Sequence, residues 1–272
     1  MLRKFVRNAL ERFPTIAQYL RNSRDLLDQR SSAKVTPWGF SLAGHDEMAA
    51  GTFEPEETKL VRKLLHDVDV LVNIGANVGY YCCHALSLNK PVIAAEPIAR
   101  NLHYLLTNLR NNGWAQLAEI FPVALGKKTD ILQMWGGGTG ASLIKGWASI
   151  HESYVTRVPV LSLDRMLGSA LKGKKALILV DIEGAELMML QGATETLQSE
   201  PRHIWMMEIA ATDHQPAGTT FNPNFAKIFE IFFEHGYRSF TADMKMQEVG
   251  KVEIDGIMAH EVRLGTHNFI FR

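Results

Sequence analysis

The sequence predicts an α/β fold in which helices cover both faces of a doubly wound, mostly parallel sheet. Three observations support this class. From residue 69 onward short apolar runs alternate with helical stretches, the apolar runs are typical of strands buried on both faces, and a glycine-rich turn follows the first run. A Rossmann-like sheet of this kind binds ligands beyond the carboxyl ends of its strands.

The composition is that of an ordinary globular protein, and 272 residues suffice for one large domain with an appended segment. The 29 basic residues balance the 29 acidic residues, which argues against a nucleic-acid partner. No apolar stretch approaches the roughly 20 residues of a membrane span. The two cysteines, Cys82 and Cys83, are adjacent and therefore poorly placed for a disulfide, so we expect a reduced, cytoplasmic protein.

Residues 1–35 are predicted to form a basic helical extension, divided near Pro14, and residues 36–272 the Rossmann-like domain. Residues 1–30 carry seven basic and three acidic side chains. This excess is compatible with peripheral contact with an anionic membrane surface or a partner. A solvated helix pair that packs on the main domain is the interpretation that we favour. The oligomeric state is left open.

The elements follow in order. A small β-like segment occupies residues 36–42, and Pro55 with two glutamates opens a helix that runs through Leu65. Further helices are expected at 80–88, 98–111, 185–197 and 224–234. Strands are expected at 69–74, 91–96, 118–124, 176–181 and 203–208, and the segments 237–240 and 267–271 could close the sheet.

Two strand pieces, 130–135 and 155–161, interrupt the alternation. The glycines of residues 136–142 between them disfavour both helix and strand, so we expect a mobile loop there. A substrate lid and a surface hairpin excursion are equally open interpretations.

Glycine, amide and carboxyl groups gather at the predicted strand ends. The residues at these ends are Asn73, Gly75, Glu96, Ala124, Asp181 and Glu208. Each of them alone could be a helix cap or a turn residue, but together they predict a cofactor pocket. Gly75 allows a tight turn beside a ligand, and Gly79 lets the next helix pack closely. Glu96 lies about twenty residues further on, where an acidic side chain binds a ribose diol.

These features predict a nucleoside-containing cofactor. A dinucleotide site would prefer Gly-x-Gly-x-x-Gly, but Asn77 occupies the second glycine position. A pyrophosphate needs bare backbone there, whereas S-adenosylmethionine has no phosphate and tolerates the side chain. An NAD-dependent oxidoreductase or epimerase is the alternative that this reasoning disfavours.

Several motifs resemble those of the FkbM family of S-adenosylmethionine-dependent methyltransferases. Residues 73–81 (Asn-Ile-Gly-Ala-Asn-Val-Gly-Tyr-Tyr) are similar to the first family motif, Glu96-Pro97 to the second, and residues 122–126 to the third. The most distinctive similarity is Val-Leu-Ser-Leu-Asp at 160–164 followed by Leu-Val-Asp-Ile-Glu-Gly-Ala-Glu at 179–186. The resemblance covers roughly residues 36–272 and implies a seven-stranded methyltransferase sheet.

The resemblance implies methyl transfer from S-adenosylmethionine to a hydroxyl of a small molecule or saccharide, such as a glycan or a lipid-linked sugar. The residues that it implies for cofactor binding are Asn73, Gly75, Ala76, Asn77, Gly79, Glu96, Pro97, Val123, Ala124 and Asp181. Glu96 would bind the ribose hydroxyls, Val123 and Ala124 the adenine, and Asp181 would face the methionine end. One departure is Asn73, because the family usually has aspartate there, and a charge-assisted bond to the cofactor ammonium would be lost.

The acceptor hydroxyl must lose its proton, and the candidate bases are Asp181, Glu208 and, more weakly, His151. Carboxyl groups near Asp181 could hold a hard cation, but we expect no metal and assign Glu186 to a helix cap instead. A non-catalytic scaffold on this fold is the remaining alternative.

Overall fold

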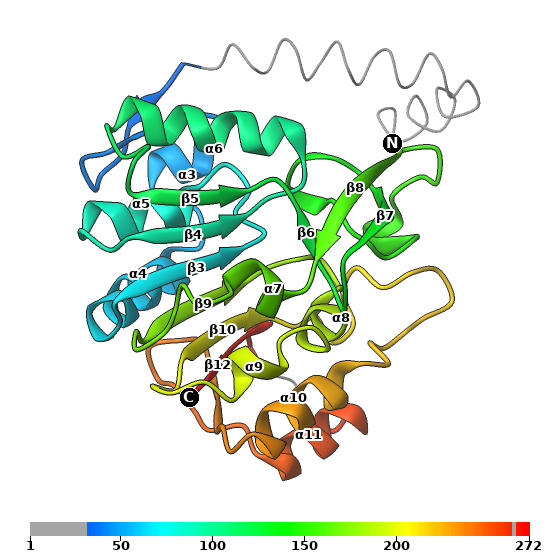
Figure 1. Cartoon of the computed structure of the whole chain (residues 1–272). Coiled ribbons are helices and arrows are strands. Elements are labelled where there is room, and N and C mark those ends of the chain that lie inside the picture. The colour runs from blue at the N-terminus through cyan, green and yellow to red at the C-terminus, as the bar shows by residue number, and fades with distance from the viewer. Residues whose placement is uncertain (1–31, 263–264) are drawn as a thin grey trace.

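The computed structural model describes residues 32–262 and 265–272. Its centre is a seven-stranded sheet in the order β11-β12-β10-β9-β3-β4-β5 (Figure 1). Only β12 runs antiparallel to its neighbours. The doubly wound, mostly parallel, seven-stranded prediction is confirmed, with strands β3 (Val70–Ile74), β4 (Val92–Ala95), β5 (Ala118–Phe121), β9 (Ala176–Val180), β10 (Ile204–Glu208), β11 (Ser239–Thr241) and β12 (Asn268–Phe271).

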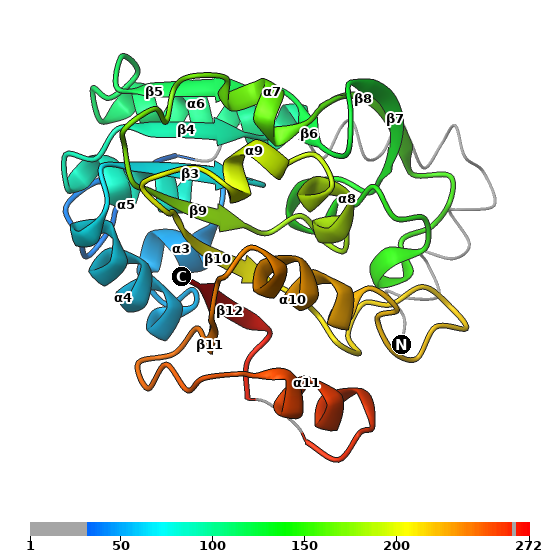
Figure 2. The ribbon, with the colours of Figure 1, turned by 60° about the horizontal axis from the view of Figure 1, so that its bottom comes forward.

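Helices cover both faces of this sheet because its strands are apolar on both sides (Figures 1 and 2). One face packs against α4 (Pro55–Leu64), the short η1 (Leu65–Asp67), α5 (Tyr80–Ser87) and α6 (Ala99–Asn111). The other face packs against α7 (Leu163–Leu167), α8 (Glu186–Leu190), α9 (Thr194–Leu197), α10 (Phe225–Glu234) and α11 (Lys251–Met258). The chain order along the sheet reverses at β3, which lies between β4 and β9, so the switch point predicted for a ligand is there.

A small N-terminal unit packs beside α5 and α6. It contains β1 (Lys34–Val35), β2 (Ser41–Leu42) and α3 (Asp46–Ala50). The two strands pair with each other, so the β-like segment predicted at 36–42 is the turn and second strand of a hairpin. Lys34 and Val35 fall within the predicted extension, and its predicted helices at residues 1–30 lie outside the described residues.

The third predicted strand, 118–124, was too long. Strand β5 ends at Phe121, and Pro122, which lacks the N–H that a ladder needs, follows it. The chain then joins a separate three-stranded sheet of β6 (Ala124–Leu125), β8 (Val155–Leu161) and β7 (Asp130–Trp135). This small sheet is the interruption predicted at 130–135 and 155–161.

The single helix predicted at 185–197 is instead two helices, α8 and α9, with a turn between them at Gly192. A Cβ atom at this position would lie 2.4 Å from the carbonyl oxygen of Gly126, so the chain passes too closely for a side chain. Three helices were not predicted: α3 and α7, whose five residues each are too few for a clear helical period, and α11. Among the described residues, no helix has both the length and the apolar composition needed to cross a bilayer.

Candidate functional site

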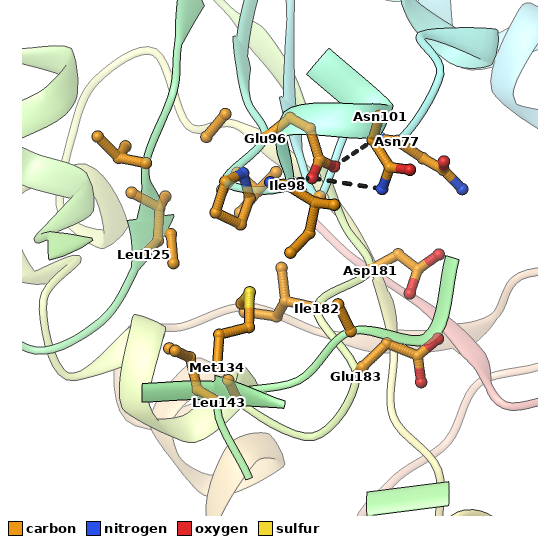
Figure 3. A pocket seen from close by; sticks show the side chains of 18 of the residues that line it. Asn77, Glu96, Ile98, Asn101, Leu125, Met134, Leu143, Asp181, Ile182 and Glu183 are labelled. Carbon is orange, nitrogen blue, oxygen red and sulfur yellow. Dashed lines mark hydrogen bonds between the residues drawn. The ribbon is translucent and has the colours of Figure 1, made fainter. Parts of the chain in front are cut away.

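A pocket opens at the carboxyl edge of the sheet, where β3, β4 and β9 end and the three-stranded sheet covers them (Figure 3). It encloses about 550 Å³, part of it open to solvent. Seven residues that the sequence analysis assigned to the cofactor line it: Gly75, Asn77, Glu96, Pro97, Val123, Ala124 and Asp181.

The carboxyl group of Glu96 is buried and held in place by backbone donors. Oε1 accepts from the N–H of Ile98 and Oε2 from the N–H of Asn77, both at 2.8 Å, and Asn101 Nδ2 lies 3.4 Å from Oε1. Burial raises the pKa of Glu96 to about 7, although these donors lower it. Each carboxylate oxygen can accept a further hydrogen bond, so the group is preorganised to bind a diol.

The turn after β3 brings two strand ends unusually close together. Gly75 has a φ of +82°, and a Cβ there would lie 1.8 Å from the carbonyl oxygen of Asp181. Only glycine fits this approach. Asn77 follows with a φ of +50°, a conformation that asparagine tolerates better than most residues. The backbone N–H of Asn77 already donates to Glu96, so it is not available to bind a pyrophosphate.

Two amide oxygens in the pocket have no partner within the described part of the chain, Oδ1 of Asn77 and Oδ1 of Asn101. Buried amide oxygens are normally hydrogen-bonded, so these two positions favour a ligand that carries donors. They flank Glu96 on the polar side of the pocket, where Figure 3 shows the amide and carboxyl groups together. This side fits the ribose of a nucleoside.

The opposite side of the pocket is apolar. Figure 3 shows aliphatic and thioether side chains there, and the lining includes Ile98, Leu125, Met134, Leu143 and Ile182. All of them except Leu125 belong to one apolar cluster at the junction between the two sheets. A flat aromatic base would bury its faces among these side chains, so the pocket as a whole fits a nucleoside with a polar extension.

The glycine loop forms a wall of this pocket through Gly138 and Thr139. It contains η2 (Gly138–Gly140), and η3 (Trp147–Ser149) follows. Asn101 Nδ2 donates to the carbonyl oxygen of Gly138 at 2.9 Å. Trp147 Nε1 donates to Glu183 Oε2 at 2.6 Å and so ties the far end of the segment to the residues after β9. The segment therefore encloses the pocket and is more than a surface excursion.

Asp181 and Glu208 form a hydrogen-bonded pair of carboxyl groups at the ends of β9 and β10. Part of Asp181 is exposed to solvent, but its carboxyl group lies inside the cleft, where protein atoms surround it. Burial raises its pKa well above the ordinary value, and the charges of Glu208, Glu183 and Glu54 raise it further. Two adjacent carboxyl groups do not both ionise readily, so the pair retains a proton that an isolated aspartate would lose.

Glu54 is a member of this acidic cluster that the sequence analysis did not identify. It precedes α4, and its Oε2 accepts from the Tyr81 hydroxyl at 2.9 Å. Burial raises the pKa of Glu54 to about 7, and the charge of Glu208 adds to the effect. The sequence predicted Glu54 only as a residue at the start of a helix. Its approach to the ends of β9 and β10 depends on how α4 packs on the sheet, which the sequence pattern does not show. Asn101 was also missed as a pocket residue, because its approach to Glu96 depends on how α6 packs.

Five predicted site residues lie outside the pocket lining, and four of them are distant from the acidic pair or support the turn. Asn73 is buried beneath the turn, where Nδ2 donates to Cys82 Sγ at 3.4 Å. Ala76 packs in the core, and a Cβ on Gly79 would meet Leu105 at 2.4 Å, so both positions support the turn. His151 is exposed, and its Nδ1 lies 3.0 Å from Ser153 Oγ.

Glu208 also lies outside the lining, but it reaches the pocket through Asp181. Glu186, predicted as a cap, accepts from the N–H of Gly184 at 2.9 Å at the start of α8. Within residues 32–262 and 265–272, no three histidine, cysteine or acidic side chains converge to hold a metal ion.

The sheet order and the pocket at its switch point define a methyltransferase-like α/β fold. The chain belongs to the family of FkbM methyltransferase domains, whose family model matches residues 73–239. The matched segment begins at the glycine turn and includes Glu96, Asp181 and Glu208. The predicted family resemblance is therefore confirmed. No curated protein matches the chain.

The chain is similar to several solved structures at low sequence identity. The FkbM methyltransferase from Methylobacillus flagellatus is 16% identical, with a TM-score of 0.44 over 94% of this chain and 60% of that protein. The chain thus spans about three fifths of that protein's length. An O-methyltransferase from Bacillus cereus in complex with SAH is 10% identical, with a TM-score of 0.46 over 83% of each chain. Aeropyrum pernix fibrillarin, with natively bound S-adenosyl-L-methionine, is 12% identical, with a TM-score of 0.40 over 79% of this chain and 75% of that one.

Proposed function

We propose that this protein is an S-adenosylmethionine-dependent O-methyltransferase that acts on a hydroxyl of a small molecule or saccharide. The observation that carries the proposal is the arrangement of two kinds of carboxyl group around one pocket. Glu96 is held by backbone N–H groups beside an apolar slot, and the Asp181–Glu208 pair lies at the neighbouring strand ends. Family membership supports methyl transfer as the reaction.

The binding residues have separate tasks. Glu96 accepts hydrogen bonds from the ribose hydroxyls, while Asn77 and Asn101 offer their unpartnered amide oxygens to the same part of the ligand. The apolar side chains beside Leu125 and Met134 hold the adenine and exclude water from it. Asp181 and Glu183 face the cationic end with negative charge, which compensates for the neutral Asn73.

The bound cofactor supplies a methyl group on a sulfonium centre, and the protein must align an acceptor oxygen and remove its proton. The Asp181–Glu208 pair performs the second task. When the pair has lost its shared proton, Asp181 has a carboxylate oxygen that can take the hydroxyl proton, and its raised pKa makes that oxygen a stronger base than an ordinary aspartate. His151 is placed less well for this role, because it lies outside the pocket lining.

Two measurements test the proposal. Calorimetry should detect S-adenosylmethionine binding, and binding of NAD instead would overturn it in favour of the oxidoreductase alternative. A radiolabelled methyl-transfer assay against saccharides and small hydroxylated metabolites should then reveal an acceptor. If no acceptor is methylated, and Asp181→Ala and Glu208→Ala leave all function unchanged, the protein is a non-catalytic scaffold.

A further inference from the structure

A short glycine-rich loop forms one wall of the cofactor pocket. Trp135 and Ser142 exchange backbone hydrogen bonds at 2.8 and 2.9 Å, so residues 136–141 between them form a loop with a closed base, which we call the flap. The flap lines the pocket through Gly138 and Thr139, and four of its six residues are glycine. Glycine has weak conformational preferences of its own, so the position of the flap depends on the contacts that hold it.

One side chain of α6 holds the flap and lines the same pocket. The amide nitrogen Nδ2 of Asn101 donates to the carbonyl oxygen of Gly138 at 2.9 Å and also lies 3.4 Å from Glu96 Oε1 (Figure 3). Both hydrogens of this nitrogen therefore have an acceptor, which fixes the orientation of the amide group. Asn101 thus fastens the flap beside the carboxyl group that is proposed to bind the ribose.

The amide oxygen of Asn101 is left for a ligand. Asn101 is 3% exposed, and its Oδ1 has no hydrogen-bond partner within residues 32–262 and 265–272. A buried amide oxygen normally accepts a hydrogen bond, and Asn101 lines the pocket, so a bound nucleoside can supply the missing donor. One amide group then contacts the flap through its nitrogen and the ligand through its oxygen.

The flap is held in a backbone conformation that suits glycine. Gly136 and Gly138 have φ values of +91° and +71°, and a Cβ atom on Gly136 would lie 2.8 Å from Ile150 Cδ1. A side chain at Gly136 would therefore oppose this position of the flap. Because Gly136 lies outside the described pocket lining, the flap can be disturbed at its base without a change in the residues that face the ligand.

We propose that Asn101 is a positioning residue that closes the flap over the bound cofactor, with its amide oxygen accepting from the nucleoside while its amide nitrogen holds Gly138. This inference rests on the proposed methyltransferase function and adds a gating step to cofactor binding. A donor on the ligand orders the Asn101 side chain, so the bond to the flap and the bond to the ligand stabilise each other. The closed flap then slows release of the cofactor while the acceptor is methylated.

Hydrogen exchange tests whether the cofactor orders the flap through Asn101. Saturating S-adenosylhomocysteine should slow exchange of the flap amides by at least about fivefold in the unmodified protein. In Asn101→Ala the bound ligand should leave the flap exchanging almost as fast as in the free protein, while Glu96 keeps both of its backbone donors. Residues 112–117, in the turn before β5 at the opposite edge of the sheet, are the reference segment and should not respond. Equal protection of the flap in both proteins would overturn the proposal.

Release kinetics give a second readout that leaves Asn101 in place. Gly136→Ala strains the flap at its base and should raise the dissociation rate of S-adenosylhomocysteine about tenfold. Gly113→Ala is the matched control, because Gly113 lies in the reference turn at a φ of +73° with open space around it, and this variant should keep the rate of the unmodified protein.

The double variant separates the flap role of Asn101 from a ligand contact alone. Asn101→Ala should also raise the dissociation rate, but Asn101→Ala with Gly136→Ala should fall short of the product of the two single effects. An unchanged rate in Gly136→Ala, or a double variant that equals the full product, would contradict the flap role while leaving the proposed function intact. Failure of the unmodified protein to bind S-adenosylhomocysteine at all would instead contradict the proposed function.

Discussion

Two carboxyl sites at the same sheet edge differ in what surrounds them. Glu96, after β4, accepts from two backbone N–H groups at 2.8 Å, so its position and its charge are stabilised by the fold itself. Asp181, after β9, faces three other carboxyl groups and hydrogen-bonds to one of them. Burial raises both pKa values, and this difference in surroundings suits the ligand-holding role proposed for Glu96 and the proton-exchange role proposed for the Asp181–Glu208 pair.

The largest expected effect is at the proton-exchange site. Asp181→Asn or Glu208→Gln should lower kcat by about 10²–10⁴, because each removes the base of the pair. The double variant should lose little more than either single variant, since groups that act as a unit are not additive. Steady-state kinetics with a saturating acceptor measures this. Glu119→Gln, an exposed carboxyl on the far edge strand, is the control, and a fully additive double variant would show that the two groups act separately.

A smaller effect is expected at the ligand-holding site. In Glu96→Gln the new NH₂ group would face a backbone N–H, so one buried donor would lose its acceptor. The dissociation constant for S-adenosylmethionine should rise about 10- to 100-fold, which corresponds to the roughly 1.5–3 kcal/mol of a hydrogen bond to a charged group. Calorimetry measures this, and kcat at saturating cofactor should change little. A fall in kcat with an unchanged dissociation constant would contradict the ligand-holding role of Glu96.

The acidic cluster also predicts a shift in pH dependence. The pair must be ionised to accept a proton, so kcat should fall at low pH. The charge of Glu54 raises the pKa of Asp181, and Glu54→Gln removes that charge. The acid limb of the kcat profile should therefore move to lower pH, while Glu119→Gln leaves it in place. An acid limb that moves to higher pH would mean that the charge of Glu54 does not raise the pKa of the pair.

The smallest effect concerns stability. Burial raises the pKa of Glu186 to about 7, so this group binds its proton more tightly in the folded state. Its contribution to stability is fully present below the unfolded pKa near 4.5 and is lost as the pH rises through 7, by at most about 1.4 kcal/mol per pH unit. Glu186→Gln should flatten the fall in melting temperature between about pH 5 and pH 8. An unchanged slope would show that Glu186 does not titrate in this window.

Some features could be predicted from the sequence because the residues that indicate them lie close together along the chain. The apolar runs around Val70 and Ala176 predicted strands buried on both faces, and the glycine turn at Gly75 and the acid at Glu96 predicted a nucleoside pocket at their ends. The motifs likewise predicted the family. These features depend on spacing and residue type along one stretch of chain, so no knowledge of distant contacts was needed.

Contacts between residues that are distant in the sequence depend on the tertiary structure. Glu54 and Tyr81 approach the Asp181–Glu208 pair because α4 and α5 pack on one face of the sheet, and Asn73 is buried because its strand position points beneath α5. Gly192 divides a predicted helix because Gly126 passes within contact distance. Burial and the proximity of like charges, which set the pKa values at the site, are properties of packing that no single segment encodes.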